Sequence, residues 1–194
     1  MNMCSLPEQN EDRGPWIATL SGIRFYIREM NLCDIPLDDM AHALSMNCRY
    51  NGHISRHYSV AEHSLIISEI LELWGASRDV QLQGLLHDIS EVFVPDIPRP
   101  FKGEITGFKE YEDALLHEAS LEFDFMYPFD ERVLWLDRNI VRNEAEALFP
   151  NPPEWTKDYE WVRPMPRYIG LDAIDAKNEW LQRYEDIRSD SMGN

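Results

Sequence analysis

Residues 60–67 read VAEHSLII and place a single histidine, His63, inside an apolar run. In a helix that begins after Ser59, a typical N-cap residue, His63 shares one face with Ile67 and Ile70. Such an apolar face points into the protein. The pattern therefore predicts a buried helix that carries one inward imidazole.

Two further segments place ligand-type side chains where apolar ones are expected. Residues 82–88 read LQGLLHD and end in the pair His87-Asp88, and Asp137 shares a helical face with Val133 and Ile140. A buried carboxylate needs a compensating charge, since desolvating an unpaired one costs several kcal/mol. Two imidazoles and two carboxylates suit a divalent metal, namely Mn²⁺, Co²⁺, Fe²⁺ or Zn²⁺, with Mg²⁺ also left open.

Each of these residues also has an ordinary structural interpretation when it is taken alone. A histidine on an apolar face is more often a hydrogen-bonded core residue than a ligand, and Asp137 could pair with Arg138 or Arg142. The dipeptide His87-Asp88 is common by chance. A metal site is favoured because three independent helices bring such groups to positions that should be apolar.

The remaining sequence is mostly helical in pattern. We expect helices at about residues 36–45, 60–74, 78–92, 106–123, 130–148 and 171–187. Residues 16–26 are typical of a small β-hairpin, and the proline-rich residues 150–166 predict an ordered irregular crossing. The fold class is therefore all-α. We expect one domain over residues 1–194, a compact helical bundle with its core at about 34–148, followed by the crossing segment and a helix at 149–187.

The charge balance narrows the class of partner. The chain has 18 Lys and Arg against 35 Asp and Glu, a net charge of −17, which repels nucleic acid and acidic membranes. A small phosphorylated substrate remains compatible, provided that cations cluster around its site. The sequence has no apolar run long enough for a membrane span and no secretory signal pattern, so we expect a cytoplasmic protein without nucleic-acid or membrane partners.

The order His63, then His87-Asp88, then Asp137 resembles the H…HD…D pattern of the HD-domain metal-dependent phosphohydrolases, whose ligands lie on a compact helical bundle. Residues 87–92, HDISEV, and 95–102, PDIPRPFK, are similar to the HD-x-x-E-V…D-x-P-x-P-x-K run of the small 5′-deoxynucleotidases and the bacteriophage dATP triphosphohydrolases. Arg49-Tyr50 resembles their Arg-Trp pair. The resemblance covers about residues 41–148.

The resemblance implies a role for each matching residue. His63, His87, Asp88 and Asp137 would be metal ligands. Glu91 would position or activate the attacking water, and Asp96 would be a second acid/base or a sugar contact. Arg49 and Lys102 would hold phosphates, while Tyr50 and Pro100 would pack on the base or deoxyribose. Apart from the resemblance, the nearby His53 and Arg56 are further candidates for phosphate contacts, with a solvent-facing loop as the alternative for His53. Trp155 and Trp161 are expected to pack against the bundle.

By the same resemblance, the chain is expected to be a phosphohydrolase of deoxynucleotides that attacks the α-phosphate. The substrate would be a dNTP, with dATP favoured and deoxynucleoside and triphosphate released, or a dNMP, as in a 5′-deoxynucleotidase. A homo-oligomer, either a dimer or a hexamer, is also implied. Two other classes stay open, namely a non-catalytic HD module that senses a nucleotide and an acidic helical interaction protein.

Overall fold

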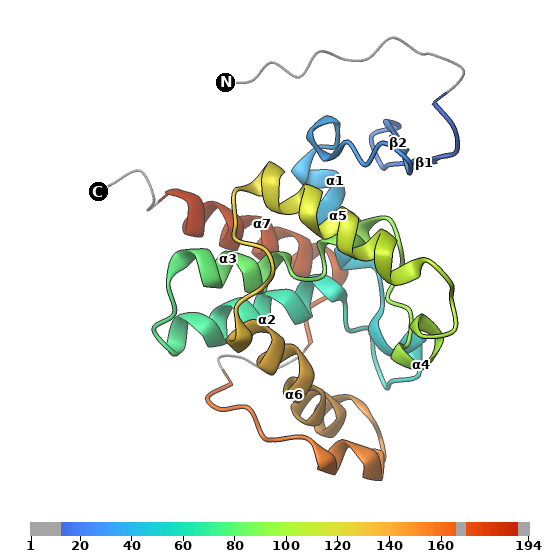
Figure 1. The fold of residues 1–194 in the computed structure, drawn as a ribbon. Coiled ribbons are helices and arrows are strands. Elements are labelled where there is room, and N and C mark those ends of the chain that lie inside the picture. The colour runs from blue at the N-terminus through green and yellow to red at the C-terminus, as the bar shows by residue number, and fades with distance from the viewer. Residues whose placement is uncertain (1–12, 166–169, 190–194) are drawn as a thin grey trace.

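The computed structural model describes residues 13–165 and 170–189 and is predominantly helical (Figure 1). The α-helices are α1 (Leu37–Met46), α2 (Val60–Leu73), α3 (Arg78–Leu86), α4 (Arg99–Lys102), α5 (Phe108–Phe123), α6 (Glu131–Leu148) and α7 (Ala173–Ser189). Short 3-10 helices are η1 (Leu32–Asp34), η2 (Arg49–Gly52), η3 (Ile89–Val92) and η4 (Glu154–Asp158). Strands β1 (Trp16–Ala18) and β2 (Arg24–Tyr26) form an antiparallel hairpin. The predicted all-α fold with an N-terminal hairpin is confirmed.

Helix α2 is the central element of the fold. It contacts α1, α3, α6 and α7, and every residue from Val60 to Ser68 is buried. Ser59 caps the helix as predicted, because its hydroxyl accepts a hydrogen bond from the backbone N–H of Glu62 at 3.1 Å. A helix that is buried all round lies inside the core. His63 therefore occupies the interior, with no exposed surface.

A glycine allows α3 to approach α2 closely. A side chain at Gly84 would collide with Leu71 of α2, and its Cβ would lie 3.2 Å from Cγ2 of Ile67. Glycine avoids both contacts, whereas a larger residue would have to displace the end of the Leu71 side chain. The close packing brings the last turn of α3, and with it His87, against the middle of α2.

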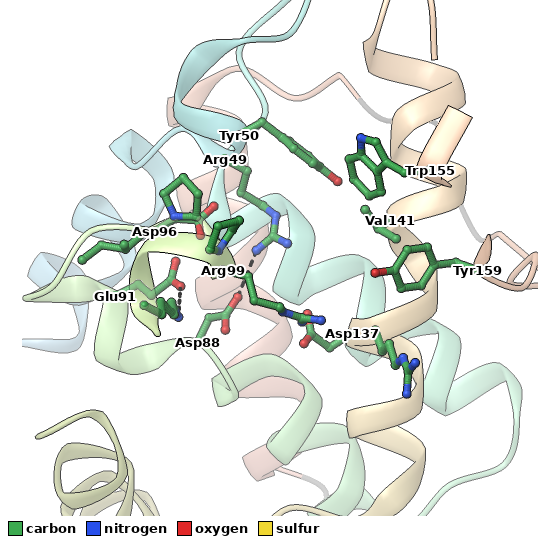
Figure 2. Close-up of a pocket in the computed structure, with 15 residues that line it drawn as sticks. Arg49, Tyr50, Asp88, Glu91, Asp96, Arg99, Asp137, Val141, Trp155 and Tyr159 are labelled. Carbon is green, nitrogen blue, oxygen red and sulfur yellow. Dashed lines mark hydrogen bonds and ion pairs between the residues drawn. The ribbon is translucent and has the colours of Figure 1, made fainter. Parts of the chain in front are cut away.

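The predicted helix at 78–92 is wrong beyond Leu86. Helix α3 ends there, and Asp88 has φ −104° and ψ 20°, outside the helical range. The imidazole of His87 contributes to the break, because its Nδ1 lies 2.9 Å from the carbonyl oxygen of Gly84 and uses an acceptor in the last turn. The chain then turns into η3. As a result, Asp88 and Glu91 line the same cavity (Figure 2).

The segment after α6 folds back along that helix as an ordered crossing. Arg142 Nη1 donates to the carbonyl oxygen of Tyr159 at 2.9 Å. Asn143 exchanges two hydrogen bonds of 3.0 Å with the backbone of Val162. The predicted irregular crossing is observed, and it contains the short helix η4. Within the described residues, no helix combines the length and the apolar character that a membrane span requires.

Candidate metal centre and its cavity

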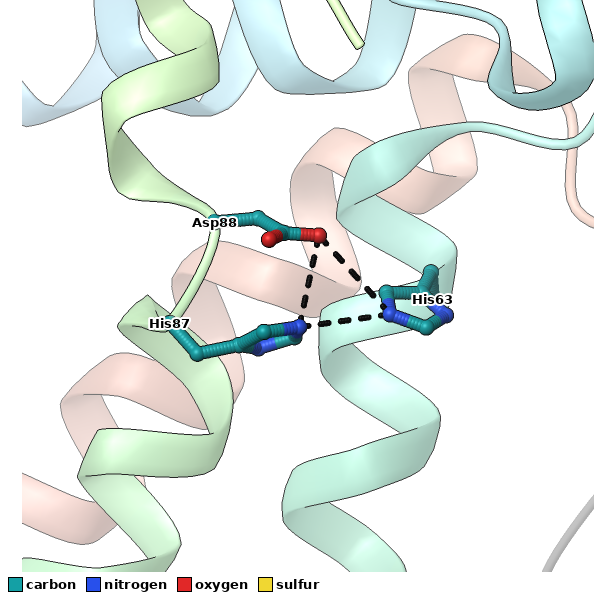
Figure 3. Close-up of side chains that lie close together, drawn as sticks. All are labelled: His63, His87 and Asp88. Carbon is teal, nitrogen blue, oxygen red and sulfur yellow. Dashed lines mark hydrogen bonds and ion pairs between the residues drawn. The ribbon is translucent and has the colours of Figure 1, made fainter. Parts of the chain in front are cut away.

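Two imidazoles face each other in the core, with the Nε2 atoms of His63 and His87 3.2 Å apart (Figure 3). The second nitrogen of each ring is already hydrogen-bonded. His63 Nδ1 lies 2.6 Å from Oε1 of Glu144, and His87 Nδ1 lies 2.9 Å from the carbonyl oxygen of Gly84. Both partners are acceptors, so each ring donates from Nδ1. The neutral rings would therefore present two Nε2 lone pairs toward one point.

Two carboxylates converge on the same point. Asp88 Oδ2 lies 3.3 Å from His87 Nε2 and 3.7 Å from His63 Nε2. Asp137 Oδ1 lies 3.4 Å from His63 Nε2 and 3.8 Å from His87 Nε2. Donors bound about 2.0–2.2 Å from one ion lie roughly 3 to 3.5 Å apart, which is close to these spacings. The group His63, His87 and Asp88 could thus hold a metal ion, and Asp137 borders it.

The electrostatics of this four-residue cluster favour a bound cation. Burial would lower the pKa of His87, but the carboxylates of Asp88 and Asp137 outweigh it, and the pKa lies well above its usual value. Burial would raise the pKa of Asp137, but hydrogen bonds from the two histidines hold it well below its usual range. The carboxylates are therefore ionised and attract positive charge. A divalent ion would replace the histidine protons in this role.

Glu144 fixes the orientation of His63, a role that the sequence did not reveal. This glutamate of α6 is fully buried and also accepts hydrogen bonds from the hydroxyls of Tyr58, at 2.8 Å, and Tyr50. Burial would raise its pKa, but the positive charges of His63 and Arg49 lower it to about 2. Glu144 is thus a permanent acceptor for His63 Nδ1. The available signal was its position, seven residues after Asp137 on the same apolar face.

Replacing Glu144 with glutamine will weaken metal binding about 10- to 100-fold, because His63 loses its charged orienting partner. Competition with a chromophoric chelator measures this change. Glu146→Gln, at an exposed position of the same helix, is the matched control and should bind metal normally. Unchanged affinity in Glu144→Gln would show that this hydrogen bond does not support the metal centre.

A cavity of about 590 Å³ opens beside the cluster (Figure 2). This size is typical of a small-molecule site, for which the range is roughly 300–1,000 Å³. Asp88 and Asp137 belong to its wall, so the cluster borders the cavity directly. The charged residues that line it are Asp88, Glu91, Asp96, Asp137, Arg49, Arg99, Lys102 and Arg138. Among the described residues of the lining, four cations balance four anions, and a divalent ion would make this lining net positive, despite the acidic chain as a whole.

Comparison with known proteins places the chain in a family. It is 36% identical over 106 residues to the uncharacterized protein YfdR of Escherichia coli (strain K12), a match that covers 53% of this chain and 57% of YfdR. It is 35% identical over 142 residues to the uncharacterized protein RCAP_rcc00048 of Rhodobacter capsulatus, which covers 69% of this chain and 72% of that protein. The chain belongs to the RCAP_rcc00048 family. No protein-family model matches the chain.

In this member of the RCAP_rcc00048 family, most of the predicted catalytic and substrate contacts line the cavity. They are Glu91, Asp96, Arg49, Tyr50, Pro100 and Lys102. Arg49 Nη1 donates to Oδ2 of Asp88 at 3.2 Å, so a guanidinium lies beside the four-residue cluster. Lys102 Nζ donates to Glu112 at 2.8 Å and lies 3.7 Å from Oε1 of Glu91.

Glu91 has a buried carboxylate oxygen that could accept a hydrogen bond from a ligand in the cavity. Its side chain is buried, and its Oε2 atom has no hydrogen-bond partner among residues 13–165 and 170–189. Burial and the nearby charges of Asp88 and Asp96 raise its pKa well above the usual value, against the lowering effect of Arg49 and Lys102. An unpartnered buried carboxylate oxygen is costly. A water molecule or a substrate hydroxyl in the cavity would satisfy it.

His53 and Arg56 are not among the described residues that line this cavity, so the structure does not support their predicted substrate contacts. Both lie exposed in the loop after η2. The reason is a sharp turn at Tyr50 and Asn51, which adopt positive φ values of 57° and 50°. This turn carries the following residues away from the cluster, and His57 Nε2 contacts the carbonyl oxygen of Ser45 at 2.9 Å instead.

The expectation for Trp155 is wrong, because this side chain lines the cavity rather than only packing against the bundle. Tyr159, Arg138 and Val141 also belong to the lining and were not predicted, while Arg99 lines it as one of the basic residues expected to flank the ligands. Trp161 does not line it and lies with its ring 4.9 Å from the guanidinium of Arg142. The sequence carries only a weak signal that Trp155 and Tyr159 lie on one surface, namely their spacing of four residues.

Proposed function

We propose that the protein is a metal-dependent phosphohydrolase that attacks the α-phosphate of a deoxynucleotide. The substrate would be a dNTP, with dATP favoured, or a dNMP. The observation that carries the proposal is the position of the His63, His87, Asp88 and Asp137 cluster at the wall of a cavity that also holds Arg49, Lys102 and Glu91. The motif resemblance to HD-domain phosphohydrolases supports the same reaction class.

A divalent ion held by the cluster would act as a Lewis acid on a phosphoryl oxygen and neutralise the charge that develops during displacement. The ligand set suits this role. It combines two imidazoles, whose Nδ1 atoms are fixed by Glu144 and Gly84, with two ionised carboxylates.

The cations of the cavity would bind and orient the phosphate. Arg49 lies against Asp88, and its planar guanidinium suits two oxygens of one phosphate group. Lys102 would act as a mobile point charge, because its ammonium lies between Glu91 and Glu112 and can exchange an acidic partner for a phosphate.

Glu91 is the candidate general base. In the proposed step, Glu91 takes a proton from the attacking water, the water oxygen bonds to the α-phosphorus, and the bond from phosphorus to the 5′ oxygen breaks. The leaving 5′ oxygen gains a proton. Asp96 lies in the same cavity and is the candidate for this transfer or for a contact with the sugar.

A product panel tests the proposal. Purified protein is incubated with dNMPs, dNTPs, ribonucleotides and cyclic nucleotides in the presence of Mn²⁺, Co²⁺, Mg²⁺ or Zn²⁺. We expect a deoxynucleoside as product, with phosphate from a monophosphate or triphosphate from a dNTP. Tight nucleotide binding without turnover would instead establish a sensing module. A protein that binds neither metal nor nucleotide would be an interaction protein.

The proposed assembly follows from the resemblance alone, and the proposed location follows from the sequence pattern. We propose a cytoplasmic homo-oligomer, either a dimer or a hexamer. Light scattering of the purified protein distinguishes these states from a monomer.

A further inference from the structure

We propose that Trp155 is the residue on which the nucleobase of the substrate stacks, with Tyr159 completing the same wall. This inference rests on the proposed function in so far as the ligand is a nucleotide. Nothing in the motifs that resemble other enzymes includes these two residues, which lie beyond residues 41–148.

The two aromatic rings line the cavity that borders the metal cluster. Trp155 belongs to η4 and Tyr159 ends it, and both lie across the cavity from Asp96 and from Arg99 at the start of α4 (Figure 2). The rings of Trp155 and Tyr159 meet edge to face, with centroids 6.2 Å apart and planes at 82°. This arrangement supports the indole from the side. Half of the Trp155 side chain remains exposed, at 50%.

One side of the cavity is charged and another is aromatic and apolar, as are the phosphate and base ends of a nucleotide. Asp88 and Asp137 lie together on one side, while Tyr50, Trp155 and Val141 gather on another (Figure 2). A nucleotide has phosphate at one end and a flat aromatic base at the other. Stacking on an aromatic side chain is a common way for a protein to hold a base, because every base has a π-face. The aromatic wall is therefore suited to the base when phosphate lies at the cluster.

Helix α6 fixes this wall relative to the metal centre. Asp137 of the cluster belongs to α6, and Arg142 of the same helix donates to the backbone carbonyl of Tyr159 at 2.9 Å. Asn139 accepts from the backbone N–H of Glu160 at 2.9 Å. One rigid helix thus carries both a ligand of the cluster and the anchors of η4. Such a frame would set the distance from base to phosphate.

Trp161 offers a matched control within the same segment. It is exposed to a similar extent, 42% against 50% for Trp155, yet it does not line this cavity. Trp161 instead lines a separate pocket together with Asn143 and Val162. Replacement of either tryptophan by alanine removes the same side chain, so their comparison separates a base contact from a general loss of aromatic packing.

The experiment measures binding with metal present in a Glu91→Gln background, so that it does not depend on turnover. The probes are two pairs that differ in the base, namely dAMP with 2-deoxyribose 5-phosphate and dATP with inorganic triphosphate. We expect Trp155→Ala to weaken binding of at least one nucleotide roughly tenfold or more. The base-free partner of that nucleotide should change less than about twofold, because it makes no stacking contact.

Two further variants make the result specific. Trp155→Phe should restore most of the nucleotide affinity, since it keeps an aromatic face, and Trp161→Ala should leave all four probes unchanged. Equal weakening of both members of a pair in Trp155→Ala would overturn the inference, because the indole would then only shape the cavity. Unchanged nucleotide binding in Trp155→Ala, or no nucleotide binding by the parent protein, would also overturn it.

Failure of the proposed function gives a different pattern. A protein that turns over no compound of the product panel, yet binds dAMP or dATP in a Trp155-dependent manner, would refute the hydrolase and retain the base wall. If the protein hydrolyses the nucleotide and Trp155→Ala leaves the Michaelis constant for that nucleotide unchanged, the proposed hydrolase is retained. The proposed stacking of the base on Trp155 is then refuted.

Discussion

Replacement of Asp88 by alanine will remove both the bound metal and the turnover. Asp88 Oδ2 lies within 3.3 and 3.7 Å of the two histidine Nε2 atoms, and it also accepts a hydrogen bond from Arg49. Without this carboxylate the site keeps two imidazoles and one acid beside a guanidinium, which repels a cation. We expect the metal content to fall from about one ion per chain toward zero. The value of kcat/KM should fall roughly 10³-fold or more, since the ion supplies several kcal/mol of charge stabilisation.

Metal content by mass spectrometry and initial rates on the preferred nucleotide measure these two effects. Asp175→Ala, which removes an exposed carboxylate of α7, is the matched control and should change neither. Thermal melting checks that Asp88→Ala remains folded. Normal activity in a folded Asp88→Ala protein would refute the ligand assignment.

Replacement of Glu91 by glutamine will keep the metal and lose the rate. Glu91 lines the cavity, but it does not belong to the cluster formed by His63, His87, Asp88 and Asp137. Glutamine has the same shape but cannot take a proton from water. We expect kcat to fall about 10²- to 10⁴-fold, the usual contribution of a general base, with metal content unchanged. Initial rates and metal analysis on one preparation make the comparison.

Glu110→Gln, on the exposed surface of α5, controls for the loss of one acidic charge and should retain full activity. The informative result is the difference between the two variants: Asp88→Ala loses metal and rate, whereas Glu91→Gln loses only rate. If Glu91→Gln loses the metal, Glu91 acts as a ligand rather than as a base. If it keeps the full rate, another group, with Asp96 as the first candidate, accepts the proton.

The convergence of the four ligand candidates could be predicted from the sequence because each departs from an otherwise apolar pattern. His63 interrupts an aliphatic face of α2, and Asp137 interrupts a similar face of α6. The His63 side chain is fully buried and that of Asp137 is only partly exposed, so both polar groups need hydrogen-bonding or ionic partners. The helix boundaries of α1, α2 and α6 follow equally local signals, such as the cap at Ser59.

The break after Leu86 and the role of Glu144 could not be predicted, because both depend on tertiary contacts. Local propensity favours a helix through residue 92, but the bond from His87 to the Gly84 carbonyl and the turn at Asp88 end it. Glu144 shares the inward face of α6 with Asp137, yet nothing in the sequence says that its partner is His63. Trp155 was misjudged for a similar reason. The fold-back that points it into the cavity depends on side chains of α6, such as Arg142.

A crystal of the protein grown with Mn²⁺, with diffraction data collected at the manganese absorption edge, tests the metal centre most directly. We expect one strong anomalous peak about 2.0–2.3 Å from His63 Nε2, His87 Nε2 and oxygens of Asp88 and Asp137. A map with manganese bound elsewhere and no peak between these four side chains would contradict this expectation.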